Sequence, residues 1–302
     1  MMVKPVQRER SGGIRGASGA LLASATVPAT RSAQGLFPGE LLANLTLREL
    51  RGKFKRSALG WLWSIINPIS SIAIYSVVFG VVFSVDPPVG RPSGLAVYAL
   101  FLVCGLLPWT FLANGMSNAT SSIVANEGLV KKVFFPRWVL PASTVLAWLA
   151  SFGVELVVLA IILAVVGNVV VTGIPALLLV IVLQTAFVFG FGLMLSAANA
   201  YFRDIQHFLA ILLNLWFYAT PIVYPPDLPP EKAHLLGFEI PLRRVLDANP
   251  MSGFVEAYRD LLYDLRGPTV TTMLELTAWA VVAVVMGLLV FRRLEPRLAE
   301  EL

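Results

Sequence analysis

Long apolar stretches alternate with short polar ones along most of the chain. Six apolar stretches contain at most one charged residue each, and they lie at about 59–84, 95–119, 141–166, 174–199, 208–224 and 272–291. A transmembrane helix needs about 20 mostly apolar residues, so the pattern predicts six membrane-spanning helices. The fifth stretch is short and contains Pro221, which predicts a kinked span.

The composition fits a membrane as the solvent. Of the 302 residues, 57% are hydrophobic and 14% are charged, and the mean hydropathy is +0.77. A soluble domain carries about 25% charged residues, so we expect an all-α integral membrane protein. The single cysteine, Cys104, excludes an intramolecular disulfide. The net charge of +5 does not indicate nucleic-acid binding, because the cations flank apolar spans.

The basic residues predict the orientation in the membrane. Six spans place both termini on one side, and 17 of the 23 Lys and Arg residues fall on that side. The positive-inside rule therefore predicts a multi-pass protein of the inner (cytoplasmic) membrane with both termini in the cytoplasm.

The region before the first span divides into two parts. Residues 1–35 are rich in Ser, Gly, Ala and Arg, which predicts a disordered basic tail. A signal peptide is the alternative, although its apolar core would be short and weakly apolar. Residues 36–58 carry leucines at helical spacing, which predicts an amphipathic helix in the membrane interface, ahead of a six-span domain at 59–302. The alternative is a basic run that only sets topology. The basic residues of this segment are Arg48, Arg51, Lys53, Lys55 and Arg56.

Two segments outside the spans stand out. A short cytoplasmic loop covers 126–141, and the longest connection covers 225–270 on the outer side. In the latter, Asn249 can cap a helix whose first position is Pro250. Apolar residues then recur at helical spacing, which predicts an amphipathic helix at the outer face.

Sequence motifs of common enzymes are absent. The chain contains no G-x-x-x-x-G-K-[ST], no H-E-x-x-H and no G-x-S-x-G. Its two histidines, His207 and His234, lie in separate loops, so neither a catalytic triad nor a metal site is expected.

One charge lies near the middle of a span. Ion-coupled transporters usually bind their coupling ion through charges inside the membrane. Glu155 alone gives thin support for such a cycle, and two interpretations stay open for it: a helix–helix contact or a direct functional role.

Six motifs, in order along the chain, resemble those of a known family. They are RGKFKRSALGWLWSIINP at the first span, LVKKVFFPRWVLP before the third, YFRDIQHFL before the fifth, NLWFYATPIVYP within it, NPMSGFVEAYRDLL before the sixth and FRRLEP after it. From about residue 40 onward, the chain resembles the permease subunit of ABC-type polysaccharide exporters, the Wzm and TagG group.

The resemblance implies six transmembrane helices with an N-terminal interface helix, a cytoplasmic coupling helix, and outer gate helices between spans five and six. It also implies a homodimer driven by a separate cytoplasmic ABC ATPase (Wzt-like). ATP and Mg would bind to that partner, and no cofactor is expected in this chain. One departure is the segment 231–250, which is longer than the family pattern suggests and leaves the geometry of the gate open.

Residue roles follow from the same resemblance. Pro221 would be the hinge of span five. The residues that would couple to the ATPase are Glu127, Gly128, Leu129, Val130, Lys131, Lys132, Val133 and Phe134. The aromatic residues that would line the translocation path are Tyr75, Phe79, Phe83, Trp216, Phe217, Tyr218 and Tyr224.

The sequence therefore predicts a non-enzymatic permease subunit that moves a lipid-linked polysaccharide outward through the inner membrane. An O-antigen, a teichoic acid and a cell-wall galactan precursor are all compatible substrates. The alternatives are an ABC permease for a drug or lipid, and a multi-pass membrane enzyme that acts on lipid-linked sugars.

Overall fold

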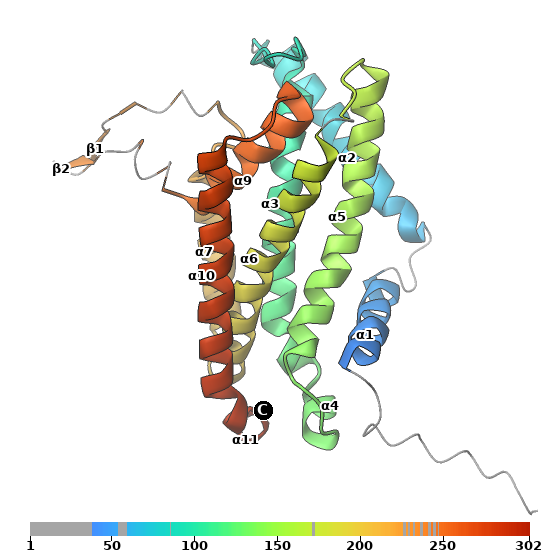
Figure 1. The fold of residues 1–302 in the computed structure, drawn as a ribbon, viewed down its shortest axis with the longest axis vertical. Helices are drawn as coiled ribbons and strands as arrows, with labels where there is room; N and C mark the ends of the chain where they lie inside the picture. The colour runs from blue at the N-terminus through green and yellow to red at the C-terminus, as the bar shows by residue number, and fades with distance from the viewer. Residues whose placement is uncertain are drawn as a thin grey trace, which may run out of the picture. The chain divides into compact units, whose positions relative to one another are not determined.

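The computed structural model describes residues 38–53, 59–84, 86–170, 173–225, 228, 230–231, 233–235, 238–240, 243, 246 and 248–302. All of these residues belong to one unit, Leu36–Leu302 (Figure 1). The predicted basic tail at 1–35 lies outside the described residues, and so do Lys55 and Arg56 of the predicted interface helix.

The unit is a bundle of long helices. Within the described residues, five helical segments are long and apolar enough to cross a membrane. The first comprises the α-helix α2 (Trp63–Tyr75) and its π-helical continuation η3 (Ser76–Val82), preceded by a short 3₁₀ turn, η2 (Gly60–Leu62). The others are α3 (Tyr98–Ala125), α5 (Val139–Val165), α6 (Ile174–Tyr201) and α10 (Val270–Leu294).

The structure has only a short helix where the sequence predicts the fifth span, at 208–224. Its helix, α7, covers Ile205–Tyr218, and at 14 residues it is about 21 Å long, shorter than a hydrocarbon core of about 30 Å. The backbone then turns, and the amide of Thr220 donates to the carbonyl of Phe217. Pro221 lies beyond the end of α7 and therefore does not bend this helix. The helix ends ahead of it because proline disfavours helical backbone in the preceding residue. The expected kinked span is therefore a short helix with a proline beyond its end.

The helices α6 and α10 approach each other at the level of their backbones. A methyl group added to Gly190 would lie 2.3 Å from the backbone carbon of Ala283, and one added to Gly287 would lie 2.2 Å from the carbonyl oxygen of Gly190. Only residues without a side chain permit such an approach. On its other side α6 packs against α3, which is the most buried of the long helices.

One end of the bundle carries short helices and is called here the α4 end. It holds α4 (Glu127–Lys132), η5 (Glu295–Arg297) and α11 (Leu298–Glu301), and α1 (Pro38–Lys53) packs on α5 near the same end (Figure 1). A separate apolar cluster forms there, and it includes Leu45 of α1, Val130 of α4 and Leu298 of α11. This cluster ties α1 and α4 to the bundle.

The opposite end, called here the α9 end, carries the long connection between α7 and α10. It contains α9 (Pro250–Arg259), its π-helical continuation η4 (Asp260–Asp264), and two antiparallel strands, β1 (Ala233–Leu235) and β2 (Phe238–Ile240). As predicted, Asn249 caps α9, and its side chain accepts a hydrogen bond from the amide of Met251. The sequence did not predict these two strands, which are a small addition to a helical fold.

Candidate functional site: the two ends and the polar cavity between them

The α4 end presents both buried and exposed side chains. Val130 is 5% exposed and packs in the apolar cluster, whereas Phe134, just beyond α4, is fully exposed. Lys131 pairs with Glu127 at 2.7 Å, and this hydrogen bond lowers the pKa of the Glu127 carboxyl. The segment predicted to couple to an ATPase therefore has an exposed rim and an anchoring residue, Val130, that faces its own chain.

A hydrogen bond joins α1 to α4. Nη2 of Arg48 donates to Oδ1 of Asn126 at 2.6 Å, and Asn126 is the residue immediately before α4. The same nitrogen lies 2.9 Å from the carboxylate of Glu49. The helix that the sequence placed in the membrane interface is thus attached to the start of the predicted coupling segment. Of the other basic residues predicted there, Arg51 is exposed and Lys53 reaches the bundle.

The aromatic residues of the first span lie in a row. The ring centroids of Tyr75 and Phe79 are 6.2 Å apart, and those of Phe79 and Phe83 are 6.0 Å apart. Phe79 also contacts Tyr98 of α3 at 4.6 Å. Phe83, at the end of the row, is largely exposed. The predicted path residues of this span therefore share one face.

The four aromatic residues predicted in span five separate into two pairs. Trp216 and Phe217 pack against Trp109 of α3, with ring centroids 6.1 and 5.5 Å away. Tyr218 is exposed, and the hydroxyl of Tyr224 donates to its carbonyl at 3.0 Å. Trp216 and Phe217 hold α7 on the bundle, while Tyr218 is exposed and Tyr224 is half-buried.

A buried arginine, not identified from the sequence, holds the connection after α7. Arg259 is 6% exposed and lies over the ring of Phe101 at 3.7 Å. Its Nη1 and Nη2 donate to the carbonyls of Pro221 and Ile222, each at 2.6 Å. Burial lowers the pKa of Arg259 to about 10, so it stays charged at neutral pH. The one signal in the sequence was a cation directly after Tyr258 in the apolar stripe.

Asp260, the residue after Arg259, forms an ion pair with Arg266. Oδ1 of Asp260 lies 2.6 Å from Nη2 of Arg266 and 2.8 Å from its Nε. Burial raises the pKa of Asp260 to about 6, although the neighbouring Arg266 acts in the opposite direction. Arg259 therefore fixes the end of α9 to the bundle, and Asp260 fixes it to the segment that leads into α10.

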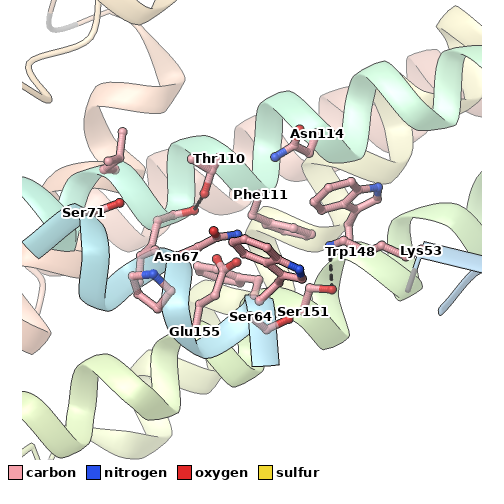
Figure 2. Close-up of a pocket in the computed structure, with 15 residues that line it drawn as sticks. Lys53, Ser64, Asn67, Ser71, Thr110, Phe111, Asn114, Trp148, Ser151 and Glu155 are labelled. Atoms are coloured by element: carbon pink, nitrogen blue, oxygen red, sulfur yellow. Dashed lines mark hydrogen bonds between the residues drawn. The ribbon is translucent and has the colours of Figure 1, made fainter. Parts of the chain in front are cut away.

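Glu155 is half-buried and faces a polar cavity (Figure 2). The cavity has a volume of about 340 Å³ and lies between α2, α3 and α5. Lys53 of α1 reaches its edge, where Nζ donates to Oγ of Ser151 at 2.9 Å and lies 3.5 Å from the centre of the Trp148 ring. Among the residues that the structure describes, no group of three or more His, Cys, Asp or Glu could hold a metal ion.

The long apolar helices define a multi-pass integral membrane protein, and the comparisons identify its family. The family described as "ABC-2 type transporter" matches residues 40–263, so the chain belongs to the ABC-2 type transporter family. The resemblance found in the six motifs is thereby confirmed.

Two curated relatives match most of the chain, and a third matches a smaller part of it. The "O-antigen export system permease protein RfbA" of Klebsiella pneumoniae is 32% identical over 266 residues, which are 86% of this chain and 94% of the relative. The protein of the same name from Myxococcus xanthus is 30% identical, over 87% of this chain and 95% of the relative. The "Polysialic acid transport protein KpsM" of Escherichia coli is 27% identical over 60% of this chain and 68% of the relative.

Proposed function

We propose that the chain is the transmembrane permease subunit of an ATP-driven exporter that moves a lipid-linked polysaccharide from the cytoplasm to the outer side of the inner membrane. The observation that carries this proposal is the similarity to O-antigen export permeases, which extends over 86% of the chain and 94% of the relative. An O-antigen is the substrate that these names favour, and teichoic acid or a galactan precursor stays a prediction.

The proposal includes a direction for the bundle. The α4 end faces the cytoplasm together with both termini, and the α9 end faces outward. In this arrangement α7 and the connection held by Arg259 complete a sixth crossing, and α9 with η4 forms the outer gate. The proposed domains are the tail at 1–35, the interface helix at 36–58 and the permease domain at 59–302.

The α4 end is the proposed contact for the ATPase. Phe134 is fully exposed, and Lys131 and Lys132 are also exposed, so an apolar ring and two cations are available to a groove on a partner. ATP and Mg would be held by that partner. The hydrogen bond from Arg48 to Asn126 would pass the motion of the coupling segment to α1.

The translocation path is proposed to form between two copies of the chain. Much of α2 and η3 is uncovered in one copy, and their aromatic row ends at the exposed Phe83. Tyr218 and Tyr224 are the matching residues near the end of α7. Apolar C–H faces of sugars pack on such rings, and weak contacts spread along a row allow a polymer to slide.

Deletion of the gene and its replacement on a plasmid test the function. We expect cells without the gene to lose surface polysaccharide and to accumulate lipid-linked polymer inside, and the wild-type gene to restore export. Surface polymer is measured on intact cells and total polymer on lysed cells. Unchanged surface polymer in the deletion strain, with an altered sensitivity to apolar drugs, would contradict the proposal.

A further inference from the structure

The polar cavity lies apart from the aromatic row and from α7. Three transmembrane segments surround it, and Figure 2 shows side chains from all three pointing into one space. Its volume of about 340 Å³ is near the lower end of the range of small-molecule sites, about 300–1,000 Å³. A cavity with this many polar groups inside a membrane bundle is unfavourable when it has no polar occupant.

Among the described residues that line the cavity, the charges balance. Lys53 contributes one positive charge at the edge, and Glu155 contributes one carboxylate one helical turn from Ser151, the residue that Lys53 contacts. A diphosphate in this space would leave its negative charge uncompensated in a medium of low dielectric constant. The charge balance therefore favours an uncharged occupant.

The other polar groups both donate and accept hydrogen bonds. Asn67 of α2 and Asn114 of α3 contribute carboxamides, and no described residue forms a hydrogen bond with either side chain. Ser64, Ser71 and Thr110 contribute hydroxyls. A carboxamide has donors and acceptors side by side, which matches neighbouring hydroxyls on a sugar ring.

The lining also offers aromatic surface. Trp63 lines the cavity and is 43% exposed over the whole residue, and its ring is of the kind on which the C–H face of a sugar packs. Ile65 and Ile69 of α2 are also exposed, but neither lines the cavity.

We propose that this cavity binds a single uncharged sugar ring carried on a membrane lipid, with Asn67 and Asn114 as its principal hydrogen-bonding residues. The sugar chemistry comes from the lining, and only the lipid-borne source rests on the proposed function. The site differs from the proposed path because it lies within one copy of the chain, between α2, α3 and α5.

Photolabelling of the purified full-length chain in lipid nanodiscs tests the site. The probe is an alkyl β-glucoside with a photoreactive diazirine in the chain next to the sugar, and labelled peptides are located by mass spectrometry. The competitors are the unlabelled alkyl glucoside, methyl glucoside, and an alkyl phosphocholine of equal chain length. We expect labels in 63–71, 106–114 and 148–155, removed by the alkyl glucoside and not by the alkyl phosphocholine.

Matched variants separate the site from general lipid contact. Asn67→Leu and Asn114→Leu should each reduce labelling about tenfold, because each removes hydrogen bonds from the sugar. Asn118→Leu is the control: Asn118 lies one turn further along α3 and does not line the cavity. The competition on the unchanged chain gives a result even if a variant does not fold.

Four results would overturn the proposal. Equal competition by alkyl phosphocholine would indicate a general lipid surface, and equal competition by methyl glucoside would exclude a lipid-borne ligand. Labelling of both Asn variants at the level of the unchanged chain would show that Asn67 and Asn114 do not contribute to binding. Absent labelling of the segments that line the cavity would show that the sugar of the probe does not enter it. None of these readouts depends on export, so they are distinct from a failure of the proposed function.

Discussion

Nη2 of Arg48 and Oδ1 of Asn126 lie 2.6 Å apart, across 78 residues of sequence. This contact connects α1 to the start of α4, two helices that otherwise meet through the apolar cluster around Leu45 and Val130. Because the pair is exposed, its contribution to the free energy of unfolding is expected to be about 1 kcal/mol or less. Under the proposed function, the contact acts as a mechanical link between α1 and the proposed coupling segment.

Loss of this link should weaken coupling without unfolding the chain. We expect Arg48→Ala and Asn126→Ala each to lower polysaccharide export per ATP hydrolysed, and the double variant to be no worse than either single one, because both remove the same contact. Export and ATP hydrolysis are measured in the complex with the ATPase. Arg51→Ala is the control, since Arg51 is exposed and forms no hydrogen bond with a described residue. Additive losses in the double variant would argue against the link.

Phe134 and Val130 should respond differently to the same substitution. Phe134→Asp should abolish co-purification with the ATPase and leave the melting temperature of the permease unchanged, because the ring is fully exposed. Val130→Asp should lower the melting temperature, because it buries a carboxylate in an apolar cluster at a cost of several kcal/mol. Leu228→Asp, on an exposed leucine near the α9 end, is the control. Intact binding by Phe134→Asp would remove the ring from the coupling surface.

Arg259 should be essential for the connection after α7. Arg259→Met leaves the carbonyls of Pro221 and Ile222 without their donor, and each unpaired buried carbonyl costs about 1–3 kcal/mol. We expect a lower melting temperature and no export, with only partial recovery in Arg259→Lys, which cannot reach both carbonyls in the same geometry. Arg293→Met, on an exposed residue of α10, should behave as wild type. A stable, active Arg259→Met variant would show that the connection after α7 keeps its conformation without these two hydrogen bonds.

The contact between α6 and α10 should tolerate no methyl group. Gly190→Ala and Gly287→Ala each place a Cβ atom against backbone, and such overpacking costs about 1–3 kcal/mol or more. We expect lower thermal stability for both variants, measured by the loss of monodisperse protein after heating. Gly153→Ala in α5 meets nothing within 4 Å and should be neutral or slightly stabilising. Equal behaviour of all three variants would refute the close crossing.

Asp260 should give the fold a dependence on pH. Burial raises its pKa from 3.8 to about 6 in the folded state, so the folded chain binds more protons than the unfolded chain between these values. The free energy of unfolding therefore falls as the pH rises from about 4 to about 6. Above that range Asp260 causes no further change in it. Thermal unfolding across this interval measures the slope, and Asp260→Asn should remove its contribution. A slope of the opposite sign would contradict a buried carboxyl at this position.

The sequence by itself determined the class of protein and most of its long helices. Apolar stretches near 95–119, 141–166, 174–199 and 272–291 lie within or overlap α3, α5, α6 and α10, because a bilayer selects for length and apolarity, and both are local properties. The cap at Asn249 was predictable for the same reason, since capping involves neighbouring residues only. The family could be identified from six short motifs, and the match at residues 40–263 confirms it.

Tertiary structure decided which polar groups meet. Arg259 and the carbonyl of Pro221 are 38 residues apart, and Lys53 and Ser151 are 98 apart, so no periodicity in the sequence reveals either contact. The same holds for Asn67 and Asn114, which line one cavity only because α2 and α3 pack together. The course of the chain after α7 also depends on a distant donor, Arg259, which bonds to the carbonyls of Pro221 and Ile222. Hydrophobic pattern fixes where helices run, whereas the pairing of buried polar groups depends on how those helices pack.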